Sequence, residues 1–190
     1  MISDVVTIVS GLPRSGTSMM MKMLEAGGLS PVTDNIRTAD EDNPKGYYEL
    51  EKVKELKNDK SWMPEAKGKV VKVISALLQD LPADHEYHVV FMRRNMQEIL
   101  DSQRQMLVRR GQPESKVPDD KMAAMFEKHL VKIEEWLAAQ PNMRVLYVKY
   151  NEILAAPADA AREVNEFLGG SLDEAAMVSV VDKQLYRQRR

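Results

Sequence analysis

Residues 5–18 read VVTIVSGLPRSGTS, and this stretch carries the strongest fold signal in the chain. Val5 to Ser10 form a short apolar run rich in β-branched residues, which is typical of a buried strand. A glycine-punctuated loop, residues 11–18, follows, and residues 19–26 are predicted to form a helix that ends at Gly27 and Gly28. A loop between a strand and a helix N-terminus can bind an oxyanion, because backbone N–H groups and the helix dipole point toward it.

The loop also contains side chains suited to an anion. Gly11 and Gly16 permit unusual backbone angles and close approach, and Arg14, Thr17 and Ser18 supply hydrogen-bond donors. The spacing is similar to the Walker A pattern G-x-x-x-x-G-K-S/T, but Thr17 stands in the lysine position. The alternative interpretation is a strand–helix turn that needs glycine only for tight packing.

Strand and helix patterns alternate along the rest of the chain. Strands are predicted at residues 70–74, 88–92 and 144–149, and helices at 47–58, 95–109 and 121–139. Two short helical segments follow, of which Pro157 opens the second. This alternation favours a parallel sheet with helices on both faces. The length of 190 residues suits a single domain, residues 1–190.

The composition of the chain argues against several classes of protein. Lys and Arg number 27 against 29 Asp and Glu, and the net charge of -2 argues against a nucleic-acid-binding protein. The chain has no cysteine, which excludes disulfides, thiolate catalysis and cysteine-based metal sites. The N-terminus lacks the basic region of a signal peptide, and no apolar run reaches the ~18 residues of a membrane span. The sequence therefore predicts a cytoplasmic protein without a membrane span.

A second anion site is predicted where the strand at 88–92 leads into the next helix. Arg94 follows the strand, and Ser102 lies about two helical turns further on. An arginine at a strand end and a hydroxyl on the following helix can converge on one phosphate. Successive side chains of a strand point to opposite faces, so only one of Arg93 and Arg94 should face the cleft of this predicted anion site. The alternative interpretation is a solvated helix start with surface arginines.

Together these stretches resemble the family of sulfotransferases that use 3′-phosphoadenosine 5′-phosphosulfate (PAPS). PRSGTS at 13–18 is similar to the family's 5′-phosphosulfate loop, and Arg94-Asn95 with Ser102 to its 3′-phosphate motif. VVKVI at 70–74 resembles the strand that carries a catalytic lysine, here Lys72. VKYNEIL at 148–154 with FLG at 167–169 resembles a tyrosine–acidic–leucine segment, and NPKGYYE at 43–49 a segment common in bacterial members. The resemblance runs in order from residue 5 to residue 169.

The resemblance implies a P-loop-like three-layer α/β/α fold with a central parallel sheet, and sulfuryl transfer from PAPS to the hydroxyl or amine of a small-molecule or glycan acceptor. It places the 5′-phosphosulfate on Arg14, Ser15, Gly16, Thr17 and Ser18, the 3′-phosphate on Arg94 and Ser102, and the adenine near Tyr150. Lys72 and Arg14 are the candidate electrophilic groups, and no metal is expected. Glu49 is the preferred base, with Glu41 and Asp42 as rivals.

Three departures from the family pattern keep other functions open. Ile74 stands where many cytosolic members have a histidine, and Met19 where many have a tryptophan that stacks on adenine. The late Arg-Lys-Gly loop is absent, and Arg187, Arg189 and Arg190 are either its substitutes or a solvated tail. The alternative functions are a P-loop small-molecule kinase and a non-catalytic nucleotide-binding or scaffold protein.

Overall fold

The computed structural model describes residues 4–34, 48–113 and 117–181. At its centre is a sheet whose strands are all parallel, in the order β2-β1-β3-β4. The strands are β1 (Val6–Gly11), β2 (Val70–Lys72), β3 (Tyr87–Arg93) and β4 (Met143–Lys149). The predicted α/β class with a central parallel sheet is confirmed.

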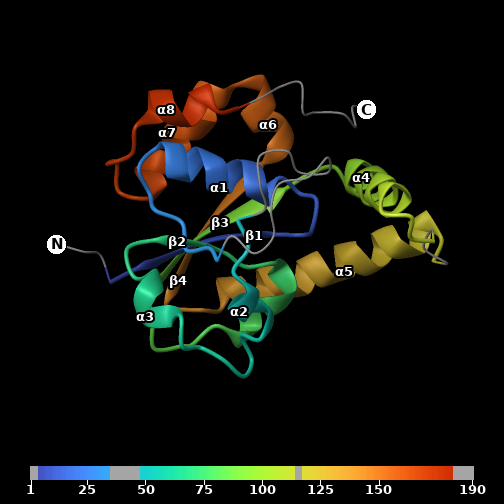
Figure 1. Cartoon of the computed structure of the whole chain (residues 1–190), viewed down its shortest axis with the longest axis horizontal. Helices are drawn as coiled ribbons and strands as arrows, with labels where there is room; N and C mark the ends of the chain where they lie inside the picture. The colour runs from blue at the N-terminus through green and yellow to red at the C-terminus, as the bar shows by residue number, and fades with distance from the viewer. Residues whose placement is uncertain (1–3, 35–47, 114–116, 182–190) are drawn as a thin grey trace.

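Helices cover both faces of the sheet (Figure 1). One face carries α1 (Thr17–Ala26), α6 (Tyr150–Ala155), α7 (Pro157–Phe167) and α8 (Glu174–Ser179). The other face carries α2 (Glu51–Lys54), α3 (Met63–Ala66), the short 3-10 helix η1 (Ser75–Asp80) and α5 (Asp119–Ala138). Helix α4 (Met96–Arg109) follows β3 and contacts α5. This is the three-layer α/β/α arrangement that the sequence predicts.

Strand β1 is buried along its whole length, because it lies between β2 and β3 and has helices on both faces. Its side chains alternate between two apolar clusters. Ile8 joins the cluster that includes α2, α3 and α5, and Val9 joins the cluster that includes α1, α6 and α7. Full burial of one such side chain contributes about 1.5–3 kcal/mol. The packing of β1 on both faces thus fixes the position at which the following loop begins.

Some predicted elements differ in extent from the observed ones. Of the predicted helix 47–58, the described residues 48–58 are helical only at Glu51–Lys54, since Tyr48 has a left-handed backbone (φ 52°) and Glu55 is already the C-cap. The predicted strand 70–74 ends at Lys72, because η1 begins at Ser75. The helix expected from residue 121 begins at residue 119.

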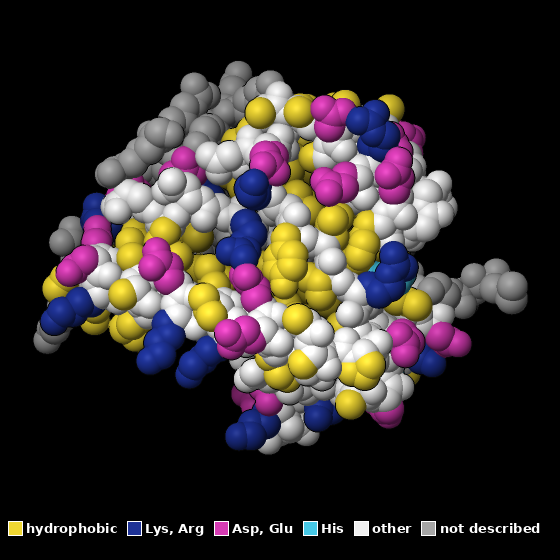
Figure 2. Space-filling view, turned by 180° about the vertical axis from the view of Figure 1, so that it is seen from behind, with side chains coloured by type: hydrophobic (Ala, Val, Ile, Leu, Met, Phe, Trp, Pro, Cys, Tyr) yellow, Lys and Arg dark blue, Asp and Glu magenta, His cyan; other side chains and the backbone are white. Residues whose placement is uncertain are grey.

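The α4–α5 pair projects from one side of the molecule (right in Figure 1). It exposes hydrophobic side chains among acidic and basic ones (left in Figure 2), and Val108, Met125 and Val131 are each more than half exposed. In the first half of α5, from residue 119 to residue 129, no described side chain is buried. This part of the molecule therefore adds little to the two clusters that hold the sheet.

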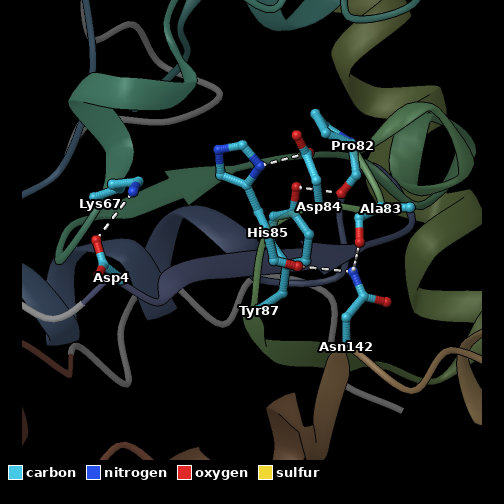
Figure 3. A network of polar contacts seen from close by, with 8 residues as sticks. All are labelled: Asp4, Lys67, Pro82, Ala83, Asp84, His85, Tyr87 and Asn142. Carbon is cyan, nitrogen blue, oxygen red and sulfur yellow. Dashed lines mark hydrogen bonds and ion pairs between the residues drawn. The ribbon is translucent and has the colours of Figure 1, made fainter.

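A polar network joins the loops at the amino ends of β3 and β4, away from the carboxyl ends of the strands (Figure 3). Asn142 Nδ2 donates hydrogen bonds to the carbonyl oxygens of Ala83 (3.3 Å) and His85 (2.7 Å). The hydroxyl of Tyr87 donates to the carbonyl oxygen of Pro82 at 2.9 Å. These bonds satisfy main-chain acceptors where two loops meet, so the network is structural.

Replacing Asn142 by alanine is expected to lower the free energy of unfolding by about 1–3 kcal/mol, because two carbonyl groups lose their donor. Thermal or urea denaturation measures the loss. Tyr87→Phe removes one such bond and should cost less. Neither change should alter ligand binding at the carboxyl ends of the strands, and an undiminished stability of Asn142→Ala would show that water replaces the amide at no cost.

Candidate active site

The strand order creates a crevice between the carboxyl ends of β1 and β3. From β1 the chain passes to β2 on one side, whereas β3 lies on the other side of β1. In open α/β sheets, ligands bind at the point where the connections diverge in this way. The loop after β1, residues 12–16, and the β3–α4 connection at Arg94 and Asn95 both begin there. The two predicted anion-binding stretches therefore meet at one edge of the sheet.

Two glycines let the loop after β1 lie close to its neighbours. Gly11 has φ 143°, and a Cβ there would lie 2.7 Å from the carbonyl oxygen of Met92. Gly16 has φ 101°, and a Cβ there would lie 2.4 Å from Cδ2 of Tyr150. Arg14 is also left-handed, with φ 72°, although it carries a side chain. Both glycine positions exclude any larger residue in this geometry.

Hydrogen bonds join the two predicted anion motifs to each other. Arg14 Nε donates to Ser102 Oγ at 2.9 Å, across 88 residues of sequence. Arg94 Nη1 donates to the carbonyl oxygen of Arg14 at 3.1 Å. Ser102 is buried, with 7% of its surface exposed. Arg14, Ser102 and Arg94 therefore form one cluster, in which the residues predicted for two different phosphates lie within reach of each other.

Side chains of α4 and α6 hold Arg94 in place. Its Nε donates to Glu98 Oε2 at 2.9 Å, and its guanidinium lies over the ring of Tyr150, 4.4 Å from the centroid. Glu98 is almost fully buried and accepts a second bond from Asn151 Nδ2 at 3.3 Å. Sequence reasoning missed Glu98 and Asn151. The available signal for Glu98 was its position four residues after Arg94 at the start of a predicted helix.

Lys72, at the end of β2, lies beside the first turn of α1. Its Nζ donates to Ser18 Oγ at 3.3 Å and pairs with Glu49 Oε1 at 3.7 Å. The side chains are only 9% (Lys72) and 22% (Glu49) exposed, so water screens this pair less than it would a surface pair. An ammonium group next to an anion loop can stabilise developing negative charge, and the adjacent carboxylate can accept a proton. The structure thus brings together three of the predicted residues.

Contacts on either side fix the backbone at Glu49. Thr33 Oγ1 donates to the carbonyl oxygen of Glu49 at 2.9 Å. The hydroxyl of the preceding Tyr48 donates to Glu25 Oε2 on α1 at 2.6 Å. Burial, together with this hydrogen bond, raises the pKa of Tyr48 well above its ordinary value, so the phenol keeps its proton at neutral pH. Contacts of Thr33 and Tyr48 therefore fix the main chain that holds Glu49 beside Lys72.

Other predicted residues, in the loop and next to it, are buried or partly buried. Ser15, Thr17 and Tyr150 are buried. Among the described residues, the Ser15 hydroxyl has no hydrogen-bond partner. Tyr150 lies between Gly16 and the guanidinium of Arg94, so its ring packs against the anion loop. Met19 is half-buried against the cluster that includes α1 and α6.

Several predicted residues lie outside the described ranges. These are Glu41 and Asp42, the rivals of Glu49, together with Arg187, Arg189 and Arg190 at the C-terminus. Of the stretch 43–49, only Tyr48 and Glu49 are described. Their predicted roles stay predictions.

Arg93 and His129 have separate, structural surroundings. Arg93 pairs with Glu134 on α5, whereas Arg94 pairs with Glu98 on α4. His129 Nε2 shares a hydrogen bond with Ser75 Oγ at 2.9 Å. Burial lowers the pKa of His129, which favours the neutral imidazole. Neither residue belongs to the cluster around Arg94.

The described ranges contain neither a metal-binding cluster nor a membrane-spanning helix. Within residues 4–34, 48–113 and 117–181, no group of three or more His, Asp, Glu or Cys could hold a metal ion. No helix in those ranges is long and apolar enough to cross a membrane.

The parallel sheet, the glycine-dependent loop and the arginine after the next strand define a P-loop-like α/β protein. A family model described as the sulfotransferase domain matches residues 4–189, and the chain belongs to this family. No curated protein is similar to it in sequence.

Solved structures of sulfotransferases share this fold at low sequence identity. The sulfotransferase domain from the curacin biosynthetic pathway superimposes with a TM-score of 0.57 and 15% identity, over 95% of this chain and 79% of that one. The sulfotransferase domain of the Synechococcus PCC 7002 olefin synthase gives 0.55 and 14%, over 99% and 84%. A retinol dehydratase in complex with androsterone and the inactive cofactor PAP gives 0.54 and 17%, over 95% and 64%. The chain thus spans less than two thirds of the retinol dehydratase.

Proposed function

We propose that the protein transfers the sulfuryl group of PAPS to a hydroxyl or amine of a small-molecule or glycan acceptor. The observation that carries the proposal is the cluster of Arg14, Ser102 and Arg94. A nucleotide with phosphate groups on both its 3′ and 5′ positions needs two anion sites a short distance apart. The bond between Arg14 and Ser102 joins residues that are predicted for these two sites, which supports the proposal.

The residues at the crevice suit a nucleotide of this kind. Loop residues 14–18 present backbone N–H groups and hydroxyls to the 5′-phosphosulfate. Arg94 offers its guanidinium to the 3′-phosphate and Ser102 its hydroxyl, while Tyr150 lies next to both the loop and Arg94. The retinol dehydratase of the same fold was solved with PAP, the product that PAPS leaves after transfer. These features support PAPS as the co-substrate.

The chemistry requires one charge to be stabilised and one proton to be removed. The acceptor oxygen or nitrogen attacks sulfur, and the bond between sulfur and the 5′-phosphate oxygen breaks, in analogy to phosphoryl transfer. Lys72 and Arg14 stabilise the charge that develops on this phosphate oxygen. Glu49 accepts the proton of the attacking hydroxyl. Glu49 pairs with Lys72 at 3.7 Å, so the proposed base and the proposed electrophilic group lie next to each other.

Calorimetric titration with PAP, 5′-AMP and Mg-ATP tests the donor site. PAP is expected to bind in the micromolar range, and Arg94→Ala to weaken it by about 10- to 100-fold, because a hydrogen-bonded charge is lost. The same substitution should change 5′-AMP binding little, since 5′-AMP has no 3′-phosphate. Arg93→Ala is the matched control: it removes the neighbouring guanidinium, which pairs with Glu134 on α5, and should leave PAP affinity unchanged.

Other results would favour other functions. Binding of Mg-ATP but not PAP would support a small-molecule kinase, and binding of no nucleotide would support a non-catalytic scaffold. Equal weakening by Arg94→Ala and Arg93→Ala would show that the assigned 3′-phosphate site is wrong.

A further inference from the structure

A buried ion pair lies at the predicted 3′-phosphate site. Arg94 Nε donates to Glu98 Oε2 at 2.9 Å, and the side chains of Arg94 and Glu98 are only 8% and 1% exposed. Asn151 Nδ2 donates to the other carboxylate oxygen of Glu98 at 3.3 Å. Burying two charges costs free energy that their attraction offsets only in part. A contribution to stability therefore does not by itself explain this pair.

The preceding arginine forms a similar pair in a different environment. Arg93 pairs with Glu134 on α5, and these side chains are 38% and 27% exposed. Water and salt screen the charges of that pair, whereas the charge of Glu98 acts on its surroundings with little screening. The two pairs combine the same residue types, so the same substitution can be compared in both.

Two further contacts hold the guanidinium of Arg94. Its Nη1 donates to the carbonyl oxygen of Arg14 at 3.1 Å, and its plane lies over the ring of Tyr150, 4.4 Å from the centroid. Neither of these partner groups carries a charge. The orientation of Arg94 therefore has support that does not depend on the charge of Glu98.

We propose that Glu98 takes the place of the nucleotide's 3′-phosphate as a counter-ion of Arg94 in the free protein, and thereby limits the affinity for that phosphate. This inference rests on the proposed function, which assigns Arg94 to the 3′-phosphate. A bound phosphate brings its own negative charge to Arg94, and the carboxylate of Glu98 then repels it. PAPS and PAP carry the same 3′-phosphate, so a weaker hold on this group speeds the release of PAP after transfer.

Calorimetric titration of Glu98→Gln with PAP and 5′-AMP tests the proposal. Glutamine keeps the shape of the side chain and an oxygen that can accept from Arg94 Nε, but it removes the charge. PAP is expected to bind about 10-fold more tightly, because a like charge no longer repels the 3′-phosphate. The affinity for 5′-AMP should change little, since 5′-AMP has no 3′-phosphate. Glu134→Gln is the matched control and should bind PAP as the parent protein does.

Thermal denaturation of the same variant gives a second readout. Glu98→Gln takes a counter-ion from a buried guanidinium, so it should unfold at a lower temperature than the parent protein. PAP should then raise its unfolding temperature by more than it raises that of the parent. A purely structural role does not predict a gain of PAP affinity together with a loss of stability. If the variant is unfolded without a ligand, PAP or sulfate should restore its native circular dichroism, and failure to restore it overturns the proposal.

Titration with inorganic sulfate separates this inference from the proposed function. Glu98→Gln should bind sulfate more tightly than the parent protein, and Arg94→Ala more weakly. Unchanged or weaker PAP binding by Glu98→Gln, with normal binding by the parent, overturns the inference and leaves the proposed function intact. If the parent binds no PAP, the proposed function fails, and sulfate decides the role of Glu98: tighter binding by Glu98→Gln than by Glu134→Gln supports it, and equal binding overturns it.

Discussion

Gly16→Ala is expected to abolish measurable PAP binding and to destabilise the protein by several kcal/mol. Gly16 has φ 101°, where a residue with a side chain costs about 1–2 kcal/mol. The added Cβ would also lie 2.4 Å from the ring of Tyr150, and relief of such overpacking costs about 1–3 kcal/mol more. The ring must then move, and with it the guanidinium of Arg94 that lies on it. Thermal denaturation and PAP calorimetry measure the two effects.

Gly28→Ala is the matched control for this substitution. Gly28 has the same φ of 101°, but a Cβ there would meet nothing within 4 Å. It should therefore show only the backbone cost and bind PAP normally. If both variants lose the same stability and both still bind PAP, the contact between Gly16 and Tyr150 does not shape the anion loop.

The strand, loop and first helix could be predicted because their signals are local. The apolar run before Gly11, the two glycines and the hydroxyls at Thr17 and Ser18 lie within fourteen consecutive residues. Parallel pairing then follows from the alternation of strands and helices. The predicted motif at Arg94 could be placed in the same way, after the end of a strand, whereas Lys72 was expected within the strand 70–74 and lies at the end of β2.

Side-chain direction could not be predicted in the same way. Arg14 has a left-handed backbone and reaches Ser102, and an arginine gives no sequence signal for that conformation. The buried Glu98 depends on the arrangement of α4 relative to Asn151, which comes from a distant part of the chain. Such contacts depend on tertiary packing. The periodicity of hydrophobic residues along the sequence gives no information about that packing.

The short helices α3 and α8 also escaped sequence reasoning. Helices of this length are unstable alone and form because tertiary contacts hold them. In α8, Met177 is fully buried, and its side chain lies so close to Gly27 that a Cβ there would be 2.8 Å from it. The sequence pattern predicts Gly27 only as a helix stop, yet its lack of a side chain also leaves room for Met177 of α8.

Lys72→Met is expected to lower sulfuryl transfer by about 10²- to 10³-fold, the effect of removing one charge-stabilising donor from a transfer site. Methionine keeps the length and apolar packing of the lysine stem, so the stability should change little. PAP affinity should fall only slightly, since Arg14, Ser102 and the loop backbone remain. Release of PAP from PAPS, with a panel of simple hydroxyl and amine acceptors, measures the rate.

Lys69→Met separates the role of Lys72 from a general loss of charge. Lys69 lies just before the amino end of β2, whereas Lys72 lies at its carboxyl end, 3.3 Å from Ser18 Oγ. Its substitution should leave both transfer and PAP binding unchanged. Glu49→Gln should also slow transfer, and most strongly with hydroxyl acceptors of high pKa, because their attack depends on a base. Unimpaired transfer by Lys72→Met, with normal PAP binding, would exclude Lys72 as the electrophilic group and leave Arg14 as the cation at the leaving oxygen.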